Sequence, residues 1–144
     1  MIAPKKRIDT VAKLKRAGTA ARKVRKGFDT EVLVCAGTGC LANGSQAVMD
    51  EIEKEAKKQR VRVKVSLHVK ATGCHGFCEK GPLVVIKPAG IFYQRVKVTD
   101  AKKVVSETLK KGEVITRLLY KDPNTKKRHE KYGDVPFYAH QQRI

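Results

Sequence analysis

All four cysteines of this chain lie in two short, glycine-rich loops. The first loop runs from Cys35 to Cys40 with the sequence CAGTGC, and the second runs from Cys74 to Cys78 with the sequence CHGFC. The spacing is therefore C-x4-C, then 33 residues, then C-x3-C. Glycine lets a backbone turn tightly and aim several N–H groups at one anionic object. Four thiolates presented in this way suit a metal ion or an iron–sulfur cluster.

Three uses of the cysteines compete. Two disulfide bonds would need an oxidising compartment, but the first thirty residues are polar and basic and include no apolar signal peptide. A structural zinc ion held by four cysteines usually takes pairs with C-x2-C spacing, and neither pair has it. A [2Fe–2S] cluster fits best, because the wider loops can surround a larger object and leave amides to bond its sulfides.

Other interpretations of the two loops are weaker. Four buried cysteines without a ligand would not explain why both pairs sit among glycines, and a catalytic dithiol would have C-x-x-C spacing. His75 lies between two candidate ligands, but a Rieske-type centre needs two histidines on one iron, so we expect His75 to be a neighbour. We expect Phe77 to shield the site from water. No general base, nucleophile or phosphate loop is evident, so the domain alone is not expected to catalyse a reaction.

Two stretches of sequence carry a family resemblance. VCAGTGC from Val34 to Cys40 and TGCHGFCEKGPLV from Thr72 to Val84 resemble the two halves of the thioredoxin-like [2Fe–2S] ferredoxin signature. More narrowly, the chain resembles the amino-terminal ferredoxin domain of the NAD(P)H- and flavin-binding (beta) subunit of multimeric [FeFe]-hydrogenases, which is related to the complex I flavoprotein subunit. The narrower resemblance rests on GPLVVIKP, IFYQRV, KGEVITRLLY and the tail VPFYAHQQRI.

The resemblance implies a one-electron carrier whose [2Fe–2S] cluster is bound by Cys35, Cys40, Cys74 and Cys78. It also implies a cytoplasmic protein whose partners are the other redox subunits of an NAD(P)-linked hydrogenase or dehydrogenase complex. A flavin- and NAD(P)-binding domain would follow the tail. The alternative from another class is a basic nucleic-acid or structural binding module stapled by a four-cysteine zinc site.

The charge of the chain is extreme. Among 144 residues there are 32 Lys and Arg against 14 Asp and Glu, a formal net charge of +18. Such a charge favours acidic partners. Nucleic acid is the less favoured one, because aromatic residues are few, Trp is absent and the basic residues are spread over a strand face and two tails. No apolar run approaches the length of a membrane span, so no membrane insertion is expected.

The chain divides into three predicted segments. Residues 1–30 form a basic leader, partly helical or disordered, with an amphipathic helix interrupted near Gly18. Residues 31–120 form the thioredoxin-like domain that the resemblance implies, and residues 121–144 form a charged linker and tail.

Within the domain we expect an α/β fold, a small mixed sheet with flanking helices. Periodicity and turn residues predict strands over 31–35, 61–69, 83–87 and 91–98, and helices over 45–59 and 100–112. Both cysteine loops would then leave strand ends at one edge of the sheet. The Gly81–Pro82 bond is a candidate for a cis peptide.

Overall fold

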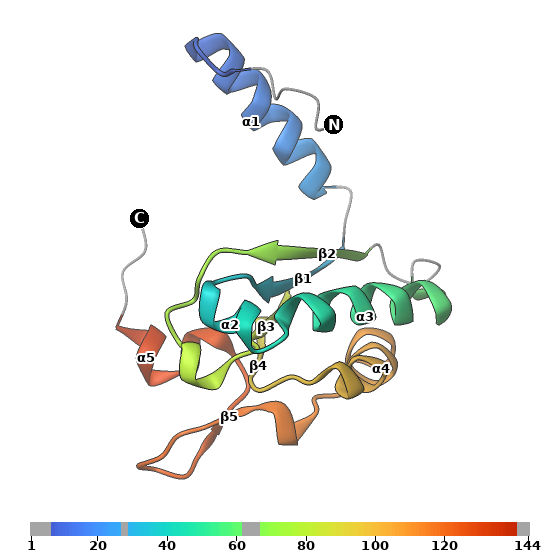
Figure 1. The fold of residues 1–144 in the computed structure, drawn as a ribbon, viewed down its shortest axis with the longest axis vertical. Helices are drawn as coiled ribbons and strands as arrows, with labels where there is room; N and C mark the ends of the chain where they lie inside the picture. The colour runs from blue at the N-terminus through green and yellow to red at the C-terminus, as the bar shows by residue number, and fades with distance from the viewer. Residues whose placement is uncertain (1–6, 27–28, 62–66, 141–144) are drawn as a thin grey trace.

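The computed structural model describes residues 7–26, 29–61 and 67–140, and a four-stranded mixed sheet lies at its centre (Figure 1). Strand β1 (Thr30–Cys35) pairs in parallel with β2 (Leu67–Thr72) and antiparallel with β3 (Val84–Lys87). Strand β4 (Ile91–Tyr93) lies beyond β3, which gives the order β2-β1-β3-β4. The mixed sheet with flanking helices that the sequence predicts is confirmed.

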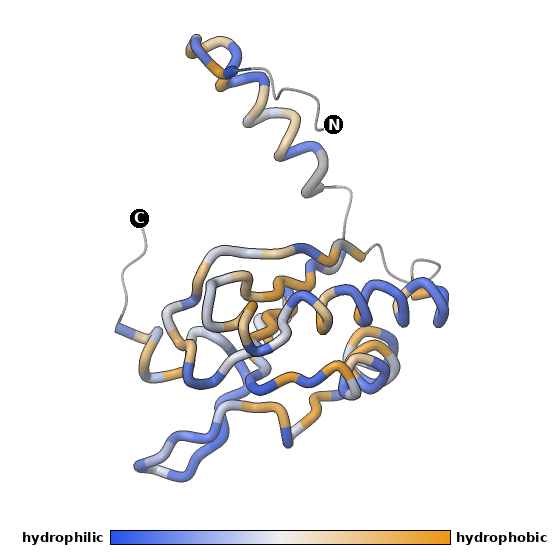
Figure 2. The backbone as a smooth tube through the Cα atoms, viewed as in Figure 1, coloured by the Kyte–Doolittle hydropathy of each residue, from blue (hydrophilic) through white to orange (hydrophobic). Residues whose placement is uncertain are grey.

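The two faces of the sheet carry separate apolar clusters, because successive residues of a strand point to opposite faces. Val32 and Val34 of β1 pack with helix α3 (Ser45–Lys58) and with the helical stretch of α4 (Ala101–Lys103) and η4 (Val104–Leu109). Leu33 and Cys35 pack in the second cluster. Figure 2, coloured by residue hydropathy, shows hydrophobic residues along the central strands and hydrophilic residues along the outer turns of α3.

The helix predicted over residues 45–59 is α3, and its buried residues follow the expected period. Val48, Ile52 and Ala56 are buried against the sheet, while the opposite side carries exposed charges such as the Lys57–Glu53 ion pair of 3.1 Å. The helix starts after Gly44, whose φ of 84° is the left-handed conformation that glycine adopts without strain. The helix predicted after Asp100 is also present, and its middle part, Val104–Leu109, is π-helical.

Two of the predicted strands differ in extent from those observed. Residues 62–66 of the strand predicted over 61–69 lie outside the described residues, as does the side chain of His68, and the observed strand β2 continues to Thr72. The strand predicted over 91–98 ends at Tyr93. There the chain bends, because Arg95 takes a positive φ of 49° and donates its backbone N–H to the carbonyl of Lys80 at 2.8 Å. The bend ties this part of the chain to the residues that follow the second cysteine loop.

The basic leader contains helix α1 (Val11–Lys26), which extends away from the sheet (Figure 1). The interruption expected near Gly18 is wrong: the helix is continuous there, and the glycine faces open space. The leader residues Ile8, Val11 and Leu14 are 54 to 69% exposed, so the described part of the leader has no core of its own. Across the described residues, no helix is both long enough and apolar enough to cross a membrane.

Residues 120–138 pack onto the domain. Strands β5 (Tyr120–Lys121) and β6 (Arg128–His129) form a hairpin, which is followed by the turn η6 (Tyr132–Asp134) and the short helix α5 (Pro136–Ala139). Val135 and Tyr138 are buried in the apolar cluster that contains Leu33 and Cys35. The division of the chain at residue 120 stays a prediction, but this segment supplies one layer of the fold.

Tyr93 joins three parts of the fold through one buried hydroxyl. The hydroxyl bonds Thr108 Oγ1 at 2.7 Å and accepts the backbone N–H of Ile115 at 3.0 Å. Burial raises the pKa of Tyr93, so this hydroxyl stays protonated at neutral pH. The sheet, the helical stretch 101–109 and the segment after it therefore meet at this group.

Replacing Tyr93 with Phe should lower the free energy of unfolding by about 1–3 kcal/mol, because a buried backbone N–H loses its acceptor. Denaturant unfolding followed by circular dichroism on the cluster-loaded protein measures this change. Tyr120→Phe is the control, since the described residues offer its hydroxyl no hydrogen bond, and it should cost less. Equal stability of the two variants would contradict the role given to Tyr93.

Candidate metal centre

The parallel pairing of β1 with β2 brings the two cysteine loops together. Cys35 is the last residue of β1, and its register partner is Thr72, two residues before Cys74. The carboxyl ends of parallel strands meet at one edge of a sheet, so both loops start side by side. A hydrogen bond of 2.9 Å from Ala36 N–H to the carbonyl of Thr72 continues the pairing past the strand ends.

Each loop places its second cysteine on a short helical turn. Cys40 lies in α2 (Thr38–Ala42), and Cys78 begins η2 (Cys78–Lys80). The Gly81–Pro82 bond that follows η2 is cis, as the sequence analysis considered. The backbone N–H of Cys35 donates to the carbonyl of Leu83 at 3.0 Å, which fixes the first loop to the chain beyond the second.

The four thiols form two pairs with different surroundings. Cys35 and Cys40 are buried, with 1% and 0% of their surface exposed, whereas Cys74 and Cys78 are exposed. Burial, together with the hydrogen bond and charge of Cys35, raises the pKa of Cys40 to about 12. The hydrogen bond and charge of Cys74 raise the pKa of Cys78. The thiols of each pair are thus close enough to oppose each other's ionisation, which a bound cation would relieve.

The four thiols lie at one edge of the sheet as two neighbouring pairs. Within each pair one thiol raises the pKa of the other, and the charge of Cys78 also acts on Cys40. A four-cysteine zinc site needs all its sulfurs around a single ion, whereas a [2Fe–2S] cluster would take two thiolates on each iron. Two neighbouring pairs of thiols are a donor set that such a cluster could use.

Glycines allow the two loops to approach each other closely. A Cβ atom added to Gly37 would lie 2.9 Å from Cys74 Sγ, and one added to Gly81 would lie 2.7 Å from Cys40 Sγ. Neither glycine has a positive φ, so space around the sulfurs is what requires glycine there. The residues present therefore fit a group as large as a two-iron cluster.

Backbone amides also face the sulfurs. Gly76 N–H donates to Cys74 Sγ at 3.3 Å, and the backbone of Leu83 hydrogen-bonds Cys40 and lowers the pKa of that thiol. Such donors stabilise negative charge on thiolate sulfur.

The side chains between the two outer cysteines turn towards the end of the chain. The His75 ring lies edge-on to Tyr132 with ring centroids 5.5 Å apart, and its Nδ1 is 3.3 Å from the Tyr132 hydroxyl. Phe77 stacks on Phe137 with centroids 4.9 Å apart and packs against Tyr120.

This aromatic contribution from residues 132–138 was not predicted from the sequence. A signal was present. The chain has four Phe and four Tyr, and three of these eight side chains lie in this stretch of seven residues. The short helix α2 was missed as well, since five residues are too few to show a helical period.

Fold and cysteine geometry agree with the comparisons to known proteins. The family model of the thioredoxin-like [2Fe–2S] ferredoxins matches residues 21–109, a stretch that includes all four cysteines. The chain belongs to this family.

Individual relatives support the same assignment. A 2Fe-2S ferredoxin of Clostridium pasteurianum is 32% identical over 79 residues, covering 55% of this chain and 76% of the relative. One from Aquifex aeolicus is 34% identical over 84 residues, covering 56% of this chain and 71% of the relative. The solved structure of a thioredoxin-like [2Fe–2S] ferredoxin from Aquifex aeolicus superposes with a TM-score of 0.57 at 29% identity, over 62% of this chain and 87% of that chain.

The predicted thioredoxin-like fold and the predicted [2Fe–2S] cofactor are therefore confirmed. The protein is an electron carrier of the [2Fe–2S] ferredoxin type, and it exchanges electrons with redox partners.

Alanine at Gly37 or at Gly81 should reduce the amount of cluster bound, because the added methyl group would meet a cysteine sulfur at less than 3.0 Å. Iron and acid-labile sulfide per chain measure the effect. Gly73→Ala, directly before the second loop, is the matched control, since a Cβ there would meet nothing within 4 Å. Full cluster content in all three variants would contradict the close approach of the loops.

Proposed function

We propose that Cys35, Cys40, Cys74 and Cys78 are the four ligands of the cluster, and that the chain passes single electrons through the outer edge of this site. The observation that carries the proposal is the arrangement of the thiols as a buried pair and an exposed pair at one sheet edge. When bound, the cluster supplies reversible one-electron transfer.

The two pairs of cysteines have different roles in this proposal. Cys35 and Cys40 would hold the inner side of the cluster among the buried apolar residues of the sheet, away from water. Cys74 and Cys78 lie at the surface, so a partner approaches the site from their side. Electron transfer between proteins requires a short separation, and the exposed loop provides it.

Nearby charges bias the reduction potential in opposite directions. Lys80 is 24% exposed and should raise the potential, whereas Glu79 should lower it. Because Glu79 is 85% exposed, water screens its charge more strongly. Lys80 and Glu79 form an ion pair of 3.7 Å, so their effects largely offset each other, and the backbone amides at Cys74 and Cys40 should raise the potential.

We further propose that the chain is the ferredoxin-like domain of an NAD(P)-linked hydrogenase or a related dehydrogenase complex in the cytoplasm. The motifs GPLVVIKP, IFYQRV and KGEVITRLLY support this assignment, as does the tail VPFYAHQQRI.

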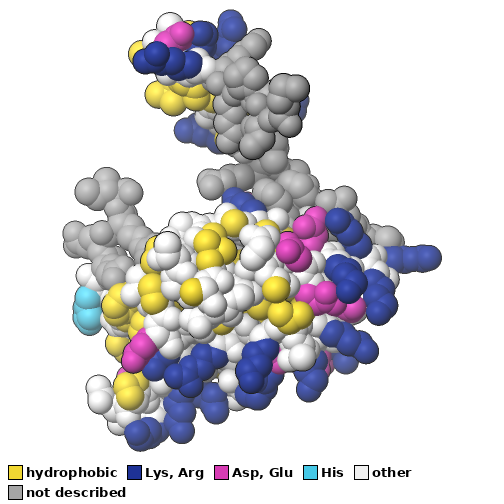
Figure 3. All heavy atoms as spheres, viewed as in Figure 1, with side chains coloured by type: hydrophobic (Ala, Val, Ile, Leu, Met, Phe, Trp, Pro, Cys, Tyr) yellow, Lys and Arg dark blue, Asp and Glu magenta, His cyan; other side chains and the backbone are white. Residues whose placement is uncertain are grey.

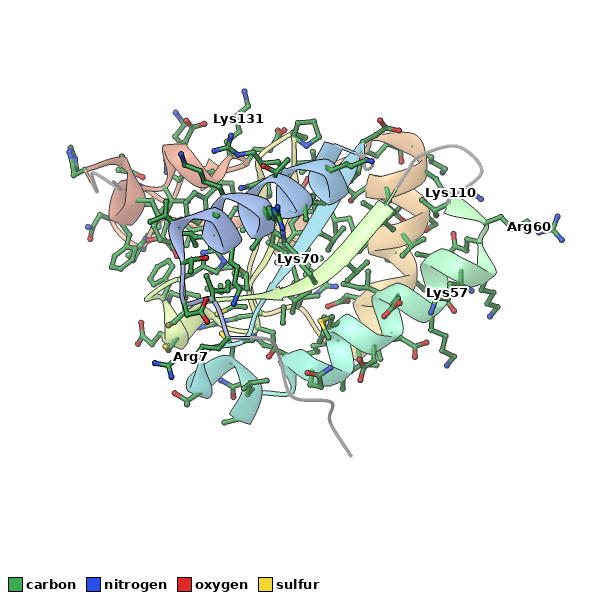
Figure 4. All side chains as sticks on the ribbon, turned by 90° about the horizontal axis from the view of Figure 1, so that it is seen from above. Arg7, Lys57, Arg60, Lys70, Lys110 and Lys131 are labelled. Atoms are coloured by element: carbon green, nitrogen blue, oxygen red, sulfur yellow. The ribbon has the colours of Figure 1, made fainter. Side chains whose placement is uncertain are left out.

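The positive charge serves docking against an acidic protein surface in this proposal. Figure 3 shows Lys and Arg side chains gathered along the lower edge of the sheet domain, and Figure 4 shows Lys57, Arg60 and Lys131 pointing outward. The leader and residues 121–131 add further exposed basic side chains. A field of one sign steers an acidic partner into contact and raises the rate of encounter.

Replacing any one of the four cysteines with serine should shift or abolish the visible and electron paramagnetic resonance spectra of the cluster, because a thiolate ligand is lost. The parent protein should contain about two iron and two sulfide per chain and give a rhombic spin-half signal on reduction.

His75→Ala is the control for this ligand set, and its cluster should still assemble. Cluster loss in His75→Ala together with retention in one of the serine variants would refute the assignment. One zinc ion per chain in native material, without iron, would refute the proposed function itself.

Electron transfer between this chain and the other redox subunits of the complex should slow by roughly tenfold as ionic strength rises from 0.01 to 0.1 M, because salt screens the attraction. Removing residues 1–28 should weaken assembly and leave the cluster spectrum unchanged. Freeze-quench spectroscopy of the reduced cluster measures the rate. NAD(P)H added to the isolated chain is the control and should not reduce it.

The docking proposal is wrong if the deletion changes neither assembly nor rate and the chain binds duplex DNA or RNA tightly at physiological salt.

A further inference from the structure

Each residue between Cys74 and Cys78 contacts one short stretch near the end of the chain, residues 132–138. His75 is held twice: its ring lies against Tyr132, and its backbone carbonyl accepts the Tyr138 hydroxyl at 3.1 Å. This hydrogen bond ties the backbone of the loop directly to helix α5.

Phe137 covers the other two residues of the loop. A Cβ atom on Gly76 would lie 3.6 Å from Cζ of Phe137, so the ring sits over this glycine. The same ring stacks on Phe77 with an interplanar angle of 6°. Phe137 is nevertheless 41% exposed, so it forms the boundary between the loop and water.

The sheet fixes the position of residues 132–138. Val135 is fully buried and Tyr138 is 5% exposed, both in the cluster that contains Leu33 and Phe92. Tyr132 N–H donates to the carbonyl of Gly90 at 2.8 Å, and the Tyr132 and Tyr138 rings stack with centroids 4.0 Å apart. The segment therefore holds the loop from a rigid base.

We propose that residues 132–138 are a clamp that holds the Cys74–Cys78 loop closed and limits the access of water to the outer pair of thiolates. The proposal rests on the assignment of these cysteines as ligands. The clamp lies outside residues 21–109, which match the family model, so it adds to the family core in this chain.

The clamp has two measurable effects on the cluster. Reduction adds negative charge, which water stabilises, so a site with less water has a lower reduction potential. A loop held closed also opens less often, and the cluster is lost more slowly to a chelator.

The test compares variants that keep all four cysteines. In Phe137→Ala, the potential should become more positive and cluster loss to a chelator should be roughly two- to tenfold faster, because an aromatic contact is removed. Tyr138→Phe keeps the buried ring but removes the hydroxyl that bonds the loop, and it should also accelerate loss by roughly two- to tenfold. Redox titration followed by electron paramagnetic resonance gives the potential, and bleaching in chelator gives the rate.

Two further variants serve as controls. Phe137→Tyr preserves the stacked ring and should retain the parent potential and rate. Val98→Ala truncates a side chain that is 42% exposed beside α3 rather than at the loop, and it should change neither quantity. The clamp is refuted if Phe137→Ala has the parent potential, or if Phe137→Ala and Tyr138→Phe both lose the cluster at the parent rate. Failure of the ligand assignment shows separately, in the serine variants of the cysteines.

Discussion

The parallel pairing of β1 with β2 is the constraint on which the metal centre depends. Hydrogen bonds between these strands bring two loops that are 33 residues apart in the sequence to one sheet edge. Glycine at positions 37 and 81 then lets the loops approach closely. Gly37 lies against the sulfur of Cys74, and Gly81 lies against the sulfur of Cys40. Strand pairing thus sets the position of the thiols, and the absence of two side chains sets their separation.

A strongly basic protein surrounds an anionic centre. The net charge of +18 stabilises the more negative, reduced state at long range. At short range, exclusion of water by residues 132–138 would act in the opposite direction. The potential therefore reflects a balance between a field that salt weakens and a local environment that salt leaves unchanged. The same positive field would favour an acidic partner on the exposed side of the site.

Most of the sheet and the identity of the cofactor could be predicted from the sequence, because each depends on local signals. Val32 to Val34 form a short apolar run, Val48 and Ile52 show a helical period, and the cysteines come with their glycines. The packing of residues 120–138 could not be predicted, since it depends on contacts across the fold rather than on local pattern. The charged turn residues of 121–133 are typical of a linker. In the structure, however, Asp122 is buried and strands β5 and β6 pair as a hairpin.

The late position of residues 120–138 in the chain has a consequence for biosynthesis. These residues close the sheet face that carries Leu33, Val85 and Phe92, and they contact the second cysteine loop. Synthesis proceeds from the amino terminus, so all four cysteines leave the ribosome before the layer that covers this face. Until residues 120–138 have been made, the nascent chain therefore exposes an apolar surface beside its thiols.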